Sequence, residues 1–166
     1  MRKIKDLTSL DTDENLVRLA TYLESLPADY EDFDMRDFLE ANGLDALLQY
    51  VEQNGSVQSC GTAACAVGHG PAAHMFMNAE ERKLMREDDP GLAWFAYSNR
   101  VFDAPESSPQ FDWMFGGGWG NADNSVRGAA ARIRYYLDHG APDNFEHVSM
   151  YSYQNYVNDY QEYIKS

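Results

Sequence analysis

Two cysteines and two histidines lie within fifteen residues of one another, at Cys60, Cys65, His69 and His74. Thiolates and imidazoles are zinc ligands, and Cys65 and His69 are four positions apart, so they would share one face of a helix. Structural zinc sites, however, take their ligands in tight C-x(2–4)-C and H-x(3–5)-H pairs. We therefore interpret these residues as buried small cysteines and ordinary histidines, and predict neither a metal site nor a cofactor.

Cys60 is also a candidate nucleophile, because it precedes an expected helix start near Ala63, where the helix dipole and free N–H groups favour a thiolate. His69 or His74 would serve as its base, with Asn78 or Asp123 as the orienting group. No protease or hydrolase signature surrounds the thiol. We keep a cysteine-dependent hydrolase, with Cys60 and His69 as its catalytic candidates, as an alternative to a protein without enzymatic activity.

A second candidate site begins at the glycine-rich run from Gly116 to Gly120. A flexible backbone that leads into a capped helix start leaves N–H groups and a helix dipole that favour an anion. Arg127 and Arg134 are seven positions apart and would lie near one face of this helix. The run lacks the Lys-Ser/Thr ending of a phosphate-binding loop.

We predict that this block captures a small anionic, nucleotide-like ligand. The arginines would contact phosphate, the polar residues at the helix start would donate hydrogen bonds, and the tryptophans would stack on a ring. The predicted ligand-binding residues are Trp113, Trp119, Asn124, Ser125, Arg127 and Arg134. In the competing interpretation, the arginines pair with carboxylates and the tryptophans belong to the core.

The chain is strongly acidic, with 27 Asp and Glu against 13 Lys and Arg and a formal net charge of −14. Such a charge repels phosphates, so we expect no direct binding to nucleic acid. It favours a second hypothesis, in which residues 28–52 of an acidic interaction protein inhibit a host protein, for example by nucleic-acid mimicry.

Leucine spacing and turn residues predict the elements that must position these groups. Capping residues near Asp11, followed by leucines at three- and four-residue intervals, indicate a helix that Pro27 ends. Asp123, Asn124 or Ser125 would cap another helix that runs to about Leu137. Alternating β-branched runs are absent, so we predict an all-α or α-dominated fold, a compact helical bundle with irregular aromatic and glycine-rich loops.

We expect one domain over residues 1–166, because this length is typical of a single core. Its expected parts are an acidic helical layer (13–54), a small-residue central helix (60–76), an aromatic and glycine-rich loop plus helix (92–140) and a tyrosine-striped C-terminal helix (148–164). Tyr153, Tyr156, Tyr160 and Tyr163 form that stripe, which would dock on the bundle or mediate a homodimer. No apolar run approaches a membrane span and no secretory segment is present, so we expect a cytoplasmic protein that does not bind membranes.

Two motif blocks carry a resemblance to a known family. The run CGTAACAVGHGP from Cys60 to Pro71, and the downstream residues Trp113-Met114-Phe115 and Arg127 to Ile133, resemble a family of short uncharacterised proteins of bacteria and their viruses. The resemblance covers most of residues 15–140. It implies a shared fold and the role of a phage or prophage accessory protein, located in the host cytoplasm, and it implies no catalytic residue.

Overall fold

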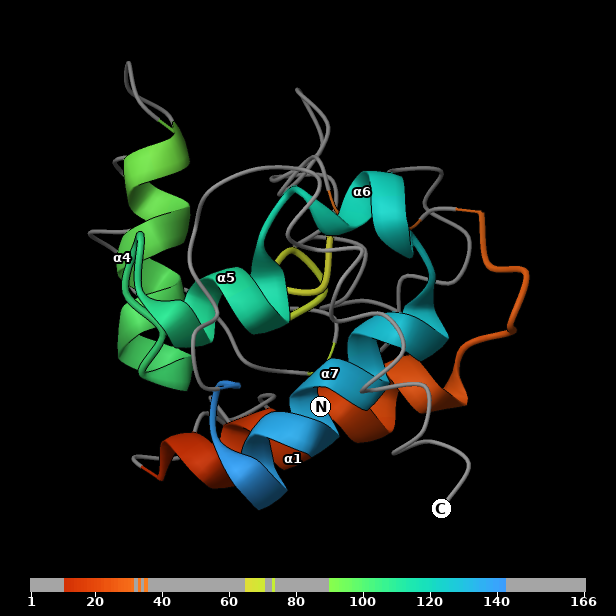
Figure 1. Ribbon diagram of the computed structural model, residues 1–166, viewed down its shortest axis with the longest axis horizontal. Helices are drawn as coiled ribbons and strands as arrows, with labels where there is room; N and C mark the ends of the chain where they lie inside the picture. The colour runs from red at the N-terminus through yellow and green to blue at the C-terminus, as the bar shows by residue number, and fades with distance from the viewer. Residues whose placement is uncertain are drawn as a thin grey trace, which may run out of the picture.

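The computed structural model describes residues 11–31, 33, 35, 65–70, 73 and 90–142. Of these residues 62% are helical and none lies in a strand, which confirms the α-dominated fold. The helices are α1 (Thr12–Ser25), α4 (Pro90–Phe102), α5 (Pro109–Phe115), α6 (Trp119–Ala122) and α7 (Val126–His139) (Figure 1). No helix within these ranges is long and apolar enough to cross a membrane. Most of residues 28–54 and the expected helix 148–164 lie outside the described residues.

Helix α1 begins where its capping residue predicts. The Asp11 carboxylate accepts hydrogen bonds from the backbone N–H groups of Asp13 and Glu14, at 3.0 and 3.2 Å, and so satisfies two of the donors that a helix start leaves open. The side chains spaced along its inner face are fully buried: Leu16, Leu19, Ala20 and Leu23. The helix ends before Pro27, as expected.

Helix α7 packs along α1, and the two lie side by side (Figure 1). Ser125 caps its start, where the hydroxyl accepts a hydrogen bond from the backbone N–H of Gly128 at 3.0 Å. Gly140, with a φ of 75°, ends it in a conformation that side chains disfavour. Its buried face is rich in alanine, at Ala129, Ala130 and Ala131, which allows close packing.

The aromatic segment expected as a loop instead contains α4, α5 and the short helix α6. Pro90 and Pro109 are the first residues of α4 and α5, a position that suits proline because the first helical N–H has no partner within the helix. Ser108 caps α5 by accepting from the N–H of Phe111 at 3.1 Å. The prolines therefore mark helix starts here, and the aromatic residues between them form buried helix faces.

The end of α4 shows how the chain turns toward α5. Asp103 adopts a left-handed conformation with a φ of 51°. Its N–H donates to the Asn99 carbonyl at 3.0 Å, and the N–H of Ala104 donates to the Ser98 carbonyl at 3.4 Å. This bonding satisfies carbonyls at the helix end. Residues 105–108, which are exposed or half-buried, form the loop that leads into α5.

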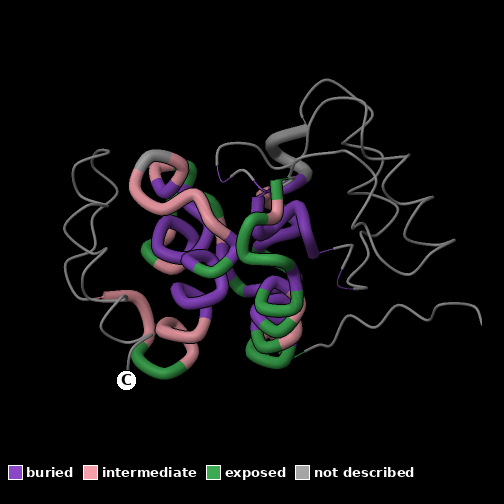
Figure 2. The backbone as a smooth tube through the Cα atoms, turned by 90° about the vertical axis from the view of Figure 1, so that its right-hand side faces the viewer, coloured by how far each residue is buried: buried purple, intermediate pink, exposed green. Residues whose placement is uncertain are grey.

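Residues 65–70 lie buried in the middle of the described core. The small-residue segment was expected as a helix, and its described part forms successive turns instead. The N–H of Gly70 donates to the Val67 carbonyl at 2.9 Å, and the N–H of His69 contacts the carbonyls of both Cys65 and Ala66. In Figure 2 the buried stretches of the described backbone lie toward its middle, and the exposed stretches lie toward its outside.

Candidate functional site

The two tryptophans predicted to stack on a ligand lie in the core. Both are fully buried and pack edge to face on each other, with ring centroids 5.4 Å apart. The Trp113 indole N–H donates to the Arg132 carbonyl at 3.0 Å. The Trp119 indole N–H contacts the carbonyls of Trp113 and Asp112, at 2.8 and 3.2 Å. Their rings and N–H groups are therefore engaged within the protein.

Arg132 extends this cluster with a buried positive charge. Its side chain is fully buried, and its guanidinium carbon lies 4.2 Å from the centroid of the Trp119 ring. One guanidinium nitrogen lies 3.4 Å from the Asp123 carbonyl. A guanidinium on an aromatic face gains from the ring quadrupole, and more so when water is excluded. Arg132 belongs to the same basic cluster as Arg127 and Arg134 but was not among the predicted ligand-binding residues, and the alanines and isoleucine around it indicate a buried stretch of helix.

The polar residues at the start of α7 also bond within the fold. The Asn124 side-chain oxygen accepts from the N–H of Met35 at 2.7 Å, and so joins this turn to the N-terminal part of the chain. Besides capping α7, the Ser125 hydroxyl donates to the Asp123 carboxylate at 2.6 Å. The nearby carboxylate of Asp123 makes this helix start less favourable for an anion than its glycines alone suggest.

Arg127 and Arg134 meet at one residue of α1. The Arg134 guanidinium donates to both carboxylate oxygens of Glu24 at 3.0 Å and to the Thr21 hydroxyl at 3.0 Å. Arg127 donates to the Glu24 backbone carbonyl at 2.9 Å. The structure thus brings both arginines of α7 to the same partner, Glu24 on the neighbouring helix α1. No ligand is needed to explain their positions, and the predicted anion site stays a prediction.

Replacing Arg134 with glutamine is expected to lower the free energy of unfolding by less than about 1 kcal/mol, because both ion-pair partners are partly exposed. Urea unfolding at low and high salt measures this loss, which salt should reduce. Glu24→Gln is the matched control. If the pair contributes as the geometry indicates, the double variant loses less than the sum of the single variants, and strict additivity would contradict the pairing.

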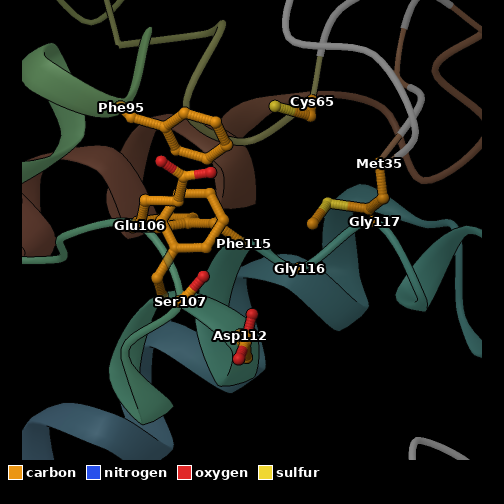
Figure 3. A pocket seen from close by; sticks show the side chains of 10 residues that line it. Met35, Cys65, Phe95, Glu106, Ser107, Asp112, Phe115, Gly116 and Gly117 are labelled. Atoms are coloured by element: carbon orange, nitrogen blue, oxygen red, sulfur yellow. The ribbon is translucent and has the colours of Figure 1, made fainter. Parts of the chain in front are cut away.

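A cavity of about 260 Å³ opens beside α5 (Figure 3). Its described lining comes from five parts of the chain: the N-terminal segment, the central turns, α4, the loop before α5, and α5 with the glycines that follow it. The lining residues are Met35, Cys65, Phe95, Glu106, Ser107, Phe111, Asp112, Phe115, Gly116 and Gly117.

The cavity has a polar mouth and a largely apolar floor. Glu106, Ser107 and Gly117 are exposed, whereas the side chains of Met35 and Cys65 are at most 2% exposed. Figure 3 shows the Cys65 sulfur pointing toward the Phe95 ring. In the same view the Glu106 carboxylate lies next to that ring. A partly apolar group therefore fits inside, with its polar end toward the mouth.

The floor also contains two rings and a buried carboxyl group from α5. Phe111 and Phe115 pack with ring centroids 5.9 Å apart, and Phe95 lies 5.3 Å from Phe111. Asp112 is only 3% exposed. The described lining includes two acidic residues and no lysine or arginine. Within this lining, the charges thus disfavour an anion.

Comparisons with protein-family models, curated proteins and solved structures found no match for this chain. A function for the chain is therefore inferred from the geometry of its site.

Of the cysteine and histidine candidates, the structure describes only Cys65 and His69. Cys60 and His74 lie outside the described residues, so the proposed nucleophile is not placed. His69 is 2% exposed, and its Nδ1 lies 2.8 Å from the Cys65 carbonyl, where the ring packs against Tyr30 and Phe33. Among the described residues, no three His, Cys, Asp or Glu side chains are grouped as metal ligands.

Tyr136, on α7, has a pKa raised above its ordinary value of 10.0, first by burial and then by the negative charges of Asp103 and Asp13. The phenol therefore stays neutral at physiological pH and supplies no base.

The cavity was not predicted, because the spacing of its lining residues along the sequence follows no recognisable pattern. Phe95, Glu106, Ser107 and Phe111 all fall within the aromatic and glycine-rich segment 92–140, and no motif there sets them apart from their neighbours. Met35 and Cys65 reach the same cavity from segments 30 positions apart in the sequence. The many aromatic residues between Trp94 and Trp119 are the available signal, because such a stretch forms either part of the core or a pocket.

Proposed function

We propose that the protein acts by binding, and that the cavity beside α5 receives a small ligand or one side chain of a partner. The cavity itself supports this proposal most. Residues from separate segments of the chain line it, and three of its lining residues are exposed to solvent. A preformed concave site with an apolar floor and a few polar groups is the usual form of a ligand site.

The size of the cavity limits its occupant. A buried apolar cavity of about 150 Å³ accepts benzene, so the volume of about 260 Å³ here accommodates roughly ten non-hydrogen atoms. This is room for one ring or one long side chain. It is not room for a base, a sugar and a phosphate together, so a nucleotide-like ligand would bind mainly outside it.

The other functions suggested by the sequence have less support from the described residues. The arginines predicted to contact phosphate both bond to Glu24 of α1, and the Asn124 side chain at the start of α7 accepts from the N–H of Met35. Most of the acidic face predicted to inhibit a partner lies outside the described ranges, as does Cys60 of the hydrolase hypothesis. The cavity gives no support to turnover, so we favour binding without a reaction.

A fragment panel tests the proposal. Neutral, cationic and anionic compounds of about ten non-hydrogen atoms would be screened by ligand-observed NMR and by thermal shift. At ten times its Kd, a ligand that binds only the folded state stabilises it by about 1.4 kcal/mol, which should raise Tm by roughly 3–6 °C.

Two variants make the screen specific for the cavity. In Gly117→Leu, the new side chain starts at the cavity wall, where an added Cβ meets nothing nearer than the Met35 carbonyl at 3.8 Å. Ala96→Leu is the matched control, because Ala96 is exposed on α4 and does not line the cavity. We expect fragments to bind the wild type and Ala96→Leu, and to bind Gly117→Leu weakly. Equal binding to all three proteins, or no binding at all, would overturn the proposal.

A further inference from the structure

We infer that the cavity beside α5 selects a cationic group on a short alkyl chain, such as an ammonium or guanidinium. This inference rests on the proposed function, because it names the chemical class that the same cavity accepts. It differs from the sequence-based expectation of an anionic ligand.

The charge at the cavity mouth carries the inference. Glu106 is exposed in the loop between α4 and α5, and within the described part of the chain no hydrogen bond or ion pair engages its carboxylate. Next to it, Ser107 presents a hydroxyl that accepts hydrogen bonds. A cation at the mouth would gain attraction and a hydrogen-bond acceptor, whereas an anion there would be repelled by Glu106.

The floor supports the same choice. Three phenylalanine rings, from Phe95, Phe111 and Phe115, line the cavity with centroids 5.3 and 5.9 Å apart in successive pairs. Aromatic faces attract cations and pack well against methylene groups. An alkylammonium or alkylguanidinium thus places its chain on the rings and its charge near the carboxylate. The net charge of −14 would also draw cations toward the protein.

Cys65 provides a reporter inside the cavity, since its sulfur points toward Phe95 (Figure 3). Methanethiosulfonate reagents convert a thiol to a mixed disulfide, because the thiolate attacks sulfur and displaces methanesulfinate. Three reagents of similar size differ in charge: methyl (neutral), 2-aminoethyl (cationic) and 2-sulfonatoethyl (anionic). Tandem mass spectrometry of the peptide that contains both cysteines distinguishes Cys65 from Cys60. Each rate is divided by the rate of the same reagent with N-acetylcysteine.

The reagents separate the two proposals. If the neutral reagent does not label Cys65, the cavity is closed to small molecules and the proposed function itself fails. If the neutral reagent labels Cys65 and the cationic and anionic reagents then react equally fast, the binding cavity stands and the cation preference is overturned. We expect the cationic reagent to react at least about tenfold faster than the anionic one at low salt, with the ratio falling as salt is added.

Glu106→Gln identifies the source of the preference. This variant should lower the cationic-to-anionic ratio by about threefold or more, because the carboxylate acts at short range. Glu14→Gln is the matched control: it removes the same charge from an exposed position on α1 that does not line the cavity. An equal fall in both variants would assign the preference to overall charge and overturn the inference.

Protection of Cys65 distinguishes the two sources of a cationic group. Agmatine tests a free guanidinium, and a short peptide with one arginine between glycines and serines tests a side chain of a partner. Slower labelling with agmatine alone indicates a free small amine, and slower labelling with the peptide indicates a partner's side chain. Protection by neither probe, at concentrations up to about 10 mM, would overturn the inference.

Discussion

Replacing Trp119 with alanine is expected to lower the free energy of unfolding by about 3–5 kcal/mol and Tm by roughly 6–20 °C. The indole ring is fully buried against Trp113. An alanine methyl group would fill only a small part of its volume, so the substitution leaves a cavity. Arg132 would lose the aromatic face that lies 4.2 Å from its guanidinium carbon, while its charge stays buried. Since single domains are stable by only about 5–15 kcal/mol, this loss is a large part of the total.

The hydrogen bonds of the Trp119 indole N–H account for part of the expected loss of stability. It contacts the carbonyls of Asp112 and Trp113 in the last turn of α5, whose carbonyl groups have few partners within the helix. Trp119→Phe keeps most of the packing and removes this donor, so it should cost about 1–3 kcal/mol and still fold.

Urea unfolding followed by circular dichroism measures both Trp119 variants. The competing hypothesis, in which Trp119 stacks on a ligand, predicts a different result: the alanine variant would keep the wild-type Tm to within about 2 °C and lose only binding. That outcome would contradict the structural role argued here.

Replacing Gly70 with alanine is the second change with a large expected effect, about 1–3 kcal/mol of lost stability. An added Cβ would overlap the Tyr97 hydroxyl and would lie 3.0 Å from both Tyr97 Cζ and the Val67 carbonyl oxygen. Tyr97 is fully buried on α4, so its ring has little room to move away.

A double variant tests this explanation. Tyr97→Phe removes the hydroxyl with which the new methyl group collides, so Gly70→Ala should cost less in the Tyr97→Phe background, by about 1 kcal/mol. Gly117→Ala is the matched control, because a Cβ there meets only the Met35 carbonyl oxygen at 3.8 Å. It should change stability by less than about 1 kcal/mol. If Gly70→Ala costs the same in both backgrounds, the collision is not the cause.

The candidate site in the structure differs from the site predicted from the sequence. The tryptophans and arginines that looked suited to a ligand have partners inside the protein, whereas the cavity beside α5 is lined by residues outside the predicted ligand-binding set. A variant at Trp119 therefore reports on folding, and variants at Glu106 and Gly117 report on binding. Testing both sets in the same assays separates the two roles.

Some features of the fold were predictable because they depend on neighbours close in the sequence. Asp11 and the leucines of α1, and Ser125 and Gly140 of α7, act within a few residues of their own positions. Hydrophobic spacing and capping are such short-range signals. The helices within the aromatic segment were not predicted, because Pro90 was interpreted as the end of the preceding segment and Pro109 as part of a surface loop, although proline suits the first position of a helix.

Composition, spacing and capping are local properties, so they were enough to predict an acidic, α-dominated protein and the approximate bounds of α1 and α7. What the chemically active side chains do depends instead on contacts between distant parts of the folded chain. Trp113 bonds to a carbonyl 19 positions away, and Arg134 pairs with a carboxylate 110 positions away. The cavity likewise joins Met35 and Cys65 to α5. Such partners meet because buried surfaces pack together, and their distances along the chain carry no pattern that a sequence reveals.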